Sequence, residues 1–197
     1  MIPEQTSLPG FGPEPKPGDS LFFAILPDAP AASRIVLLAQ QLRAAHGLKG
    51  KVLAPDRFHV TLHHLGNYAG LPPDVLAMAG EVGESVANAM PAFELGFDRA
   101  GSFSNTPRNR PLVLQGGDGL NALTRFQQTL GTALKKTPLG RGSKPGYTPH
   151  LTLLYDDRSV AQQPIKTVAW TAMELVLVHS LLGQGRHTHL GRWSLRG

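Results

Sequence analysis

The chain has 197 residues, 41% of them hydrophobic, so it is long enough for one domain with a substantial core. It contains no cysteine, which excludes disulfides and thiolate metal sites and fits a reducing compartment. The net charge of +5 is uneven, because residues 135–197 hold nine Lys and Arg against three Asp and Glu. A basic last third favours a polyanionic partner, although an ordinary solvated surface has the same composition.

The first 20 residues are rich in proline and glycine and are expected to form a flexible tail. Residues 21–197 are then a single domain. No stretch approaches the roughly 18 to 20 apolar residues of a membrane span, and the start of the chain lacks the features of a secretory leader. We therefore expect a cytoplasmic protein with no membrane partner, and we expect it to be a monomer.

The apolar patterns predict a mixture of strands and helices. The first elements are a buried strand over 21–26 and a helix that starts at Asp28 and Pro30 and stops at Gly47. The later elements are a strand over 58–65, a helix over 72–86, strands over 93–103 and 111–115, a helix over 118–138, a strand over 149–153, and closing strands over 173–182 and 187–195. Hairpins and mixed connections indicate an α+β fold.

A His-x-Thr tripeptide occurs twice, at 59–61 and at 150–152, each time in a strand-like apolar segment. A shift of 91 positions superposes the two histidines and also lays Leu21 on Leu112, where similar strands open. Each of these strands is followed by an amphipathic helix. The pattern indicates an internal duplication whose two β-α-β-like halves pack about an approximate two-fold axis, with both motifs opening into one central cleft.

The strand period of two places His59 and Thr61 on one face, and His150 and Thr152 likewise. Two histidines across a cleft can take opposite roles, one accepting a proton and the other donating one near neutral pH. Threonine hydroxyls on the same face can donate to anionic oxygens. Paired imidazoles with paired hydroxyls suit displacement at the phosphorus of a phosphodiester, and this chemistry needs no metal or other cofactor.

The ordered set of motifs resembles the 2H phosphoesterases, and in particular the RNA 2′,3′-cyclic phosphodiesterases of bacteria and archaea, also called 2′-5′ RNA ligases. The resemblance covers nearly the whole chain after the tail. It lies in the opening strand at 21–25, the two motif segments at 58–66 and 147–153, and the closing segments at 174–180 and 190–193.

This resemblance implies a bilobal α+β fold with mainly antiparallel sheets around a central cleft. It also implies hydrolysis of a 2′,3′-cyclic phosphate at an RNA or nucleotide end to a 2′-phosphate, with reversible 2′-5′ ligation as a further activity. His59 would be the proton donor and His150 the proton acceptor. Thr61 and Thr152 would bind the phosphate oxygens.

The chain departs from the family pattern at several positions. A basic residue often lies three positions after the second threonine, but here that residue is Tyr155. His63 occupies a position that is often basic, and strict alternation puts it on the face of His59, so it is a candidate phosphate neighbour. His64 replaces a core aromatic and is interpreted as a packing residue. Arg141 and Lys144, in the basic loop before the second motif, are further candidate substrate contacts.

Two other functions remain open from the sequence. A zinc hydrolase could use His59, His63 and His150, although no HExxH motif is present and no carboxylate lies beside either motif. A binding module could hold an RNA end or nucleotide without turnover, with Phe22, Phe23 or Tyr155 stacking on a base. The other histidines, at positions 46, 179, 187 and 189, lie outside the motifs, and the last two are interpreted as surface residues of a closing strand.

Overall fold

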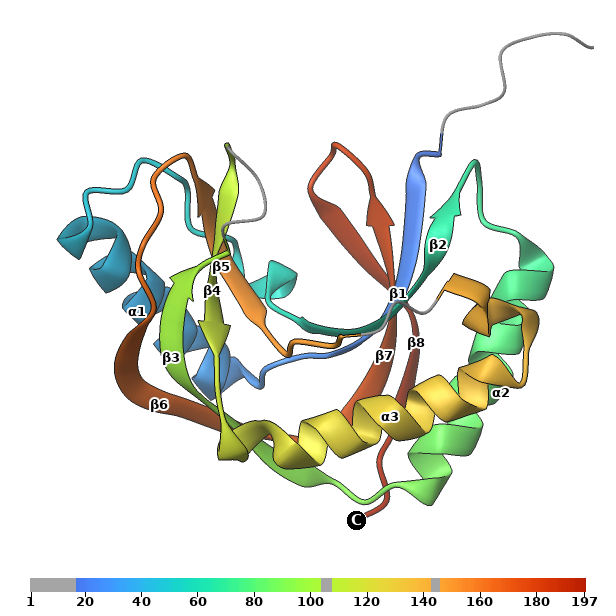
Figure 1. Ribbon diagram of the computed structural model, residues 1–197. Coiled ribbons are helices and arrows are strands. Elements are labelled where there is room, and N and C mark those ends of the chain that lie inside the picture. The colour runs from blue at the N-terminus through green and yellow to red at the C-terminus, as the bar shows by residue number, and fades with distance from the viewer. Residues whose placement is uncertain (1–16, 104–107, 143–145) are drawn as a thin grey trace, which may run out of the picture.

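The computed structural model describes residues 17–103, 108–142 and 146–197, without the side chains of 141 and 142. Within these ranges eight strands form one curved antiparallel sheet in the order β6-β3-β4-β5-β2-β1-β7-β8 (Figure 1). The strands are β1 Asp19–Ile25, β2 Val60–Tyr68, β3 Phe93–Ser102, β4 Arg110–Gln115, β5 Leu151–Asp156, β6 Gln163–Ala172, β7 Glu174–Leu181 and β8 Arg186–Ser194. The predicted α+β class is confirmed.

Three helices cover the sheet: α1 Ala29–Ala45, α2 Pro73–Ala89 and α3 Asn121–Lys135. Short 3-10 turns lie at η1 Pro55–Arg57, η2 Asp118–Leu120 and η3 Pro138–Gly142. α1 begins where the sequence predicts it, because Asp28 caps the helix: its Oδ1 accepts a hydrogen bond from the Ala31 amide at 2.6 Å. No helix in the described part of the chain is long and apolar enough to cross a membrane.

Two expectations about element boundaries need correction. β1 begins at Asp19, so the last two residues of the expected tail, 1–20, belong to the sheet, while residues 1–16 lie outside the described part. The apolar pattern predicts no strand where β6 lies. β6 is an edge strand whose first half is largely exposed, and only its second half alternates, with Val168, Trp170 and Ala172 buried. An edge strand with so few buried side chains leaves a weak pattern.

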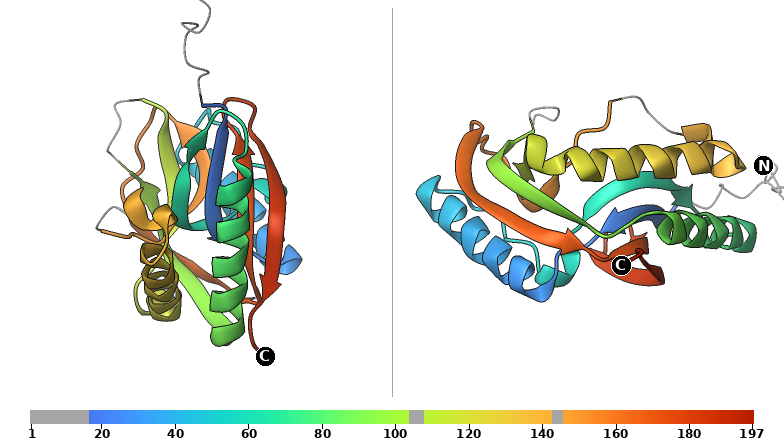
Figure 2. Two further views of the ribbon diagram at one scale, coloured as in Figure 1. Left: turned by 90° about the vertical axis from the view of Figure 1, so that its right-hand side faces the viewer. Right: turned by 90° about the horizontal axis from the view of Figure 1, so that it is seen from below.

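The sheet consists of two four-stranded halves, β6-β3-β4-β5 and β2-β1-β7-β8, which diverge from their junction (Figures 1 and 2). At this junction β2 and β5 share only one paired position, Val60 with Leu151, whereas the neighbouring strands pair along most of their lengths. Both residues are fully buried. The two motif strands therefore lie next to each other at the centre of the sheet.

The expected duplication is visible in the element order, because β1-α1-β2 and β4-α3-β5 repeat the same unit 91 positions apart. The helices tie the two halves of the sheet together. α1 packs against β5 and β6 of the opposite half, whereas α3 packs against β3 of its own half as well as against β2 and α2 of the other. The two halves are thus interlocked around the β2–β5 junction.

The main hydrophobic core lies on the helix-covered face of the sheet. Phe23 and Ile25 of β1 belong to it, together with Leu175 and Leu177 of β7. α2 approaches β8 closely at Gly83, where a Cβ would lie 2.8 Å from the Trp193 ring. This contact explains why a residue that weakens the helical pattern is present in α2.

A second, smaller cluster lies on the other face of the same strands and contains Phe22, Ala24, Val176 and Val178. Alternation along β1 and β7 sends successive side chains to opposite faces. We call the face that carries this second cluster the open face, since the cluster is separate from the helix-packed core.

The loop that leads from α1 to the first motif is anchored by a buried carboxylate at the end of β5. Asp156 accepts hydrogen bonds from the amides of Lys49, Gly50 and Arg158 at 2.6, 2.7 and 2.8 Å. These bonds lower the pKa of Asp156, and the backbone bonds from Arg158 and Gly50 are the largest causes. The first motif is therefore positioned partly by the strand that carries the second.

Candidate active site

The two motif histidines are held by the same local hydrogen bond. His59 Nδ1 donates to the Arg57 carbonyl at 2.8 Å, and His150 Nδ1 donates to the Thr148 carbonyl at 2.8 Å. A carbonyl can only accept, so Nδ1 carries a proton in both rings and Nε2 is the atom that can exchange one. Each histidine immediately precedes its strand.

All four motif side chains lie on the open face. Val60 and Leu151, which are paired, both belong to the main core on the opposite face. His59 and Thr61 flank this paired position on one strand, and His150 and Thr152 flank it on the other. The charge of His150 acts on the pKa of His59, so the two rings lie close enough to interact.

The surroundings of the two histidines differ. His59 is mostly enclosed, and burial is the largest cause of its lowered pKa, with positive charge from Arg57 and His150 acting in the same direction. The Phe22 ring lies 5.0 Å from the His59 ring, between ring centroids. His150 is only partly buried, and its ring meets the Phe103 ring edge to face, with 4.9 Å between ring centroids.

A one-residue β-bulge follows the threonine in each motif. The residues after the bulge therefore point to the face opposite the one that strict alternation predicts. In β2, Thr61 is opposite Ala24, but His63 is opposite Phe23 and His64 is opposite Phe22. Leu62 is therefore an extra residue, and His63 points to the helix-covered face while His64 joins Thr61 on the open face. The prediction from strict alternation, that His63 shares a face with His59, is wrong for this reason.

The His63 ring packs on α3. Its Nε2 lies 3.1 Å from the Gln127 carbonyl oxygen and 3.0 Å from the Gln127 side-chain nitrogen. Burial is the main cause of its lowered pKa, which disfavours the charged form that a phosphate contact requires. The zinc hypothesis with His59, His63 and His150 as ligands loses its second ligand, and no group of three or more His, Asp or Glu suited to a metal occurs within the described ranges.

His64 is exposed on the open face, where its Nε2 lies 3.0 Å from both Ser20 Oγ and Asn67 Oδ1. The matching bulge in β5 falls at Leu153, since Leu112 is opposite Leu154 but Val113 is opposite Thr152. The bulge turns Tyr155, 42% exposed, to the face of Thr152. His64 is thus not a core packing residue as expected, and it corresponds to Tyr155 in the duplication.

The remaining candidate contacts lie in the loop before the second motif and in β1. Arg141 lies in η3, but its side chain is not among the described ones, and Lys144 lies outside the described residues. Phe23 belongs to the main core, so it is not a stacking residue for a substrate base. Phe22 is only 6% exposed and its ring contacts His59, so it forms part of the wall of the site.

Two residues of the site are missed by reasoning from the sequence. His187 of β8 lies against His59 with 5.1 Å between ring centroids, and its interpretation as a surface residue is therefore wrong. Tyr147 precedes the second motif, and its hydroxyl donates to the Thr61 carbonyl at 3.1 Å. Only its place beside the motif could have suggested Tyr147, and no sequence pattern points to His187.

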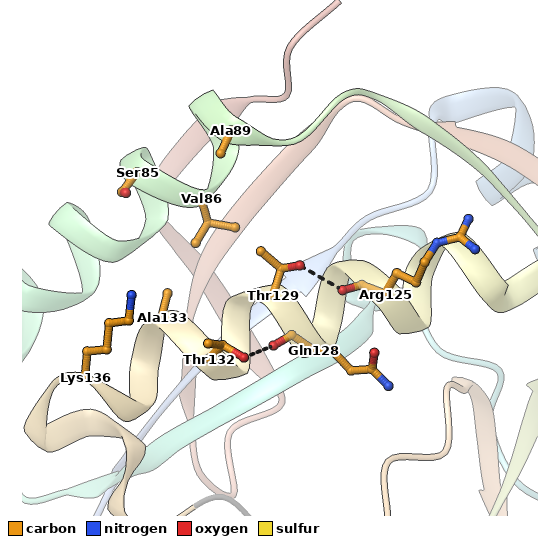
Figure 3. A pocket seen from close by; sticks show the side chains of 9 residues that line it. All are labelled: Ser85, Val86, Ala89, Arg125, Gln128, Thr129, Thr132, Ala133 and Lys136. Carbon is orange, nitrogen blue, oxygen red and sulfur yellow. Dashed lines mark hydrogen bonds between the residues drawn. The ribbon is translucent and has the colours of Figure 1, made fainter.

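A groove between α2 and α3 lies on the helix side of the protein (Figure 3). Its charged side chains are Arg125 and Lys136, and its Thr129 and Thr132 hydroxyls donate to carbonyls within α3. The groove is lined by no histidine and no carboxylate. It offers no acid–base pair and is separate from the motifs.

The match to a family model covers residues 26–183 and is described as the 2′-5′ RNA ligase superfamily. The chain belongs to this superfamily, whose two-histidine phosphoesterase fold it shares. No curated protein matches the chain in a sequence comparison.

Solved structures have the same fold. TT0787 of Thermus thermophilus is 22% identical with a TM-score of 0.73, covering 90% of this chain and 98% of that one. A protein described as a phosphoesterase is 25% identical with a TM-score of 0.70, covering 91% and 99%. Escherichia coli LigT complexed with 3′-AMP is 26% identical with a TM-score of 0.65, also covering 91% and 99%. Family and neighbours together support a phosphoesterase-type enzyme.

The Tyr147 hydrogen bond to Thr61 joins the two motifs and gives a test of their mutual support. Tyr147→Phe should lower the free energy of unfolding by about 1 kcal/mol, because the Thr61 carbonyl loses its donor. Denaturant unfolding measures this change. Tyr155→Phe is the matched control, since its side chain is exposed, and it should leave the stability within error. An equal loss in both variants would contradict the bridging role.

Proposed function

We propose that the protein hydrolyses a 2′,3′-cyclic phosphate at an RNA or nucleotide end to a 2′-phosphate. The observation that carries the proposal is the placement of two His-x-Thr motifs on one face of adjacent strands, with Nε2 as the exchangeable site of each imidazole. The superfamily and the nucleotide complexes of E. coli LigT, including those with 3′-AMP and ATP, support a nucleotide or RNA-end substrate.

In this reaction His150 Nε2 takes a proton from water as the water oxygen attacks phosphorus. The bond from phosphorus to the 3′ oxygen breaks, and that oxygen receives the proton from His59 Nε2. The product is a 2′-phosphate with a free 3′-hydroxyl. Solvent then returns the proton from His150 to His59, so the cycle balances.

The hydroxyls of Thr61 and Thr152 donate to the non-bridging oxygens of the phosphate. Neither hydroxyl has a hydrogen-bond partner among the described residues, so both are available to an anion. Fixed donors aimed at oxygens that gain charge in the transition state stabilise it more than they stabilise the substrate. The same site with a 5′-hydroxyl in place of water would join two ends through a 2′-5′ bond.

We also propose a monomeric enzyme that works in the cytoplasm. All four motif side chains come from one chain, so the site does not need a second copy. The absence of cysteine suits a reducing compartment.

His59→Ala and His150→Ala should each reduce hydrolysis of a 2′,3′-cyclic nucleotide by at least about a hundredfold, because each removes one proton-transfer group. Product analysis and steady-state kinetics with EDTA present measure the loss. His46→Ala is the control, since this ring contacts Gln163 of the edge strand β6, which β3 and β4 separate from the motif strands, and its loss should leave turnover unchanged. Wild-type binding of cyclic nucleotide without turnover would instead favour the binding module.

The lowered pKa of His59 gives a pH test of the donor role. The donor must be protonated, and burial lowers the pKa of His59 in the free protein, so kcat/KM should fall as pH rises through that lowered value. A bound anionic phosphate favours imidazolium and raises the pKa again. The alkaline limb of kcat should therefore lie at higher pH than the alkaline limb of kcat/KM. An alkaline limb of kcat at the same pH as that of kcat/KM, or at lower pH, would contradict the donor role of His59.

The bulge in β2 gives a test with neighbouring residues. Tyr155 and His64 lie on the open face beyond the threonines, and we propose that both contact the part of the substrate next to the phosphate. His64→Ala should raise KM for a cyclic-phosphate-ended dinucleotide about three- to tenfold, as expected for the loss of roughly 1 kcal/mol of binding, with kcat unchanged.

His63→Ala is the matched comparison, and it should change the stability of the protein and not its KM. It removes a ring packed on α3, so the free energy of unfolding should fall by about 1 to 2 kcal/mol while KM stays the same. Kinetics and thermal unfolding of the two variants measure both quantities. A KM effect confined to His63→Ala would show that His63, and not His64, faces the substrate, as strict alternation without a bulge predicts.

A further inference from the structure

His187 is brought to His59 by the hairpin between β7 and β8. The His187 ring lies 5.1 Å from the His59 ring at an interplanar angle of 71°, and 5.7 Å from the Phe22 ring at 76°. Phe22 and His59 are themselves 5.0 Å apart. The three rings are therefore in mutual contact, with His59 bounded by one ring from β1 and one from β8.

The hairpin is tied to the segment before the first motif. The Arg57 guanidinium donates to the Gly185 carbonyl, and the Arg57 carbonyl accepts the hydrogen bond from His59 Nδ1. Gly183 and Gly185 have φ values of +78° and +63°, which glycine adopts with little strain. One residue of η1 thus fixes both the His59 ring and the turn that carries His187.

His59 needs support beyond its Nδ1 hydrogen bond. A single bond at one ring atom fixes that atom but lets the rest of the ring swing, so Nε2 can still move relative to the phosphate. Rings on its flanks limit this motion through packing. His150 has the same backbone bond, but the described residues place only Phe103 against its ring, so lateral support by a second imidazole is particular to His59.

Burial, aided by nearby positive charge, keeps the His187 ring neutral. Burial is the largest cause of a His187 pKa of about 4, and positive charge from His59, Arg57 and His189 acts in the same direction. The one acidic group that opposes this shift is Asp56 of η1. A neutral neighbour does not repel the imidazolium form of His59, which is the form that donates a proton.

We propose that His187 is a positioning residue whose uncharged ring holds His59 in the orientation that delivers the proton. This role rests on the proposed function of His59 and extends it to a hairpin far along the chain. A phenyl ring of similar size can provide the same packing, whereas a methyl group cannot. The packing role therefore separates two substitutions that a direct substrate contact would not separate.

The test compares His187→Ala, His187→Phe and the control His189→Ala. His189 lies on the same strand two residues further on and is exposed. His187→Ala should lower kcat at least about tenfold with KM within twofold, because a loosely held donor is often misplaced. His187→Phe should recover most of kcat, and His189→Ala should match the wild type.

NMR titration of the His59 ring gives a readout that does not need turnover. In His187→Ala the pKa of His59 should rise, because the ring becomes more exposed, and His187→Phe should keep it near the wild-type value. Unchanged kcat in His187→Ala, or a Phe variant as poor as the Ala variant, overturns the positioning role. A wild-type protein that hydrolyses no cyclic phosphate defeats the proposed function instead, and the titration then still decides whether His187 governs His59.

Discussion

The backbone pairing of Val60 with Leu151 is the constraint on which the rest of the site depends. In the described part of the chain it is the one paired position between two four-stranded halves, and it holds the two motif segments side by side at their junction. This short junction is supported by α1, which packs on the opposite half, and by α3, which packs on both halves. The Tyr147 hydroxyl, which donates to the Thr61 carbonyl, supports it as well.

The sequence predicts much of this arrangement because the duplication leaves a visible repeat. The shift of 91 positions between the motifs also relates β1 to β4, α1 to α3 and β2 to β5 in the structure. Apolar alternation places Val60 and Leu151 in the core and their neighbours His59 and His150 on the other face. These are local properties, which a periodic pattern encodes directly.

Alternation fails where the backbone changes register. The bulges in β2 and β5 lie at equivalent positions in the repeat, but no residue type at these positions predicts a bulge. One extra residue exchanges the faces of His63 and His64. A bulge depends on the register between a strand and its partner strand, and the sequence of one strand does not determine that register. The contact of His59 with His187 is likewise decided by tertiary packing, since β7 and β8 join the sheet beside β1 after a crossover.

The shared backbone bond and the unequal surroundings of the two histidines have different consequences for the chemistry. Because Nδ1 of each ring donates to a carbonyl two residues earlier, each Nε2 can both take and give a proton, so either ring is competent in either role. This equivalence suits a reaction that runs in both directions, where donor and acceptor exchange roles. What makes the two rings unequal in the free protein is enclosure: His59 is confined by Phe22 and His187, and burial lowers its pKa. In the proposed reaction an anionic phosphate opposes that bias, because it favours the protonated form of His59 once it is bound.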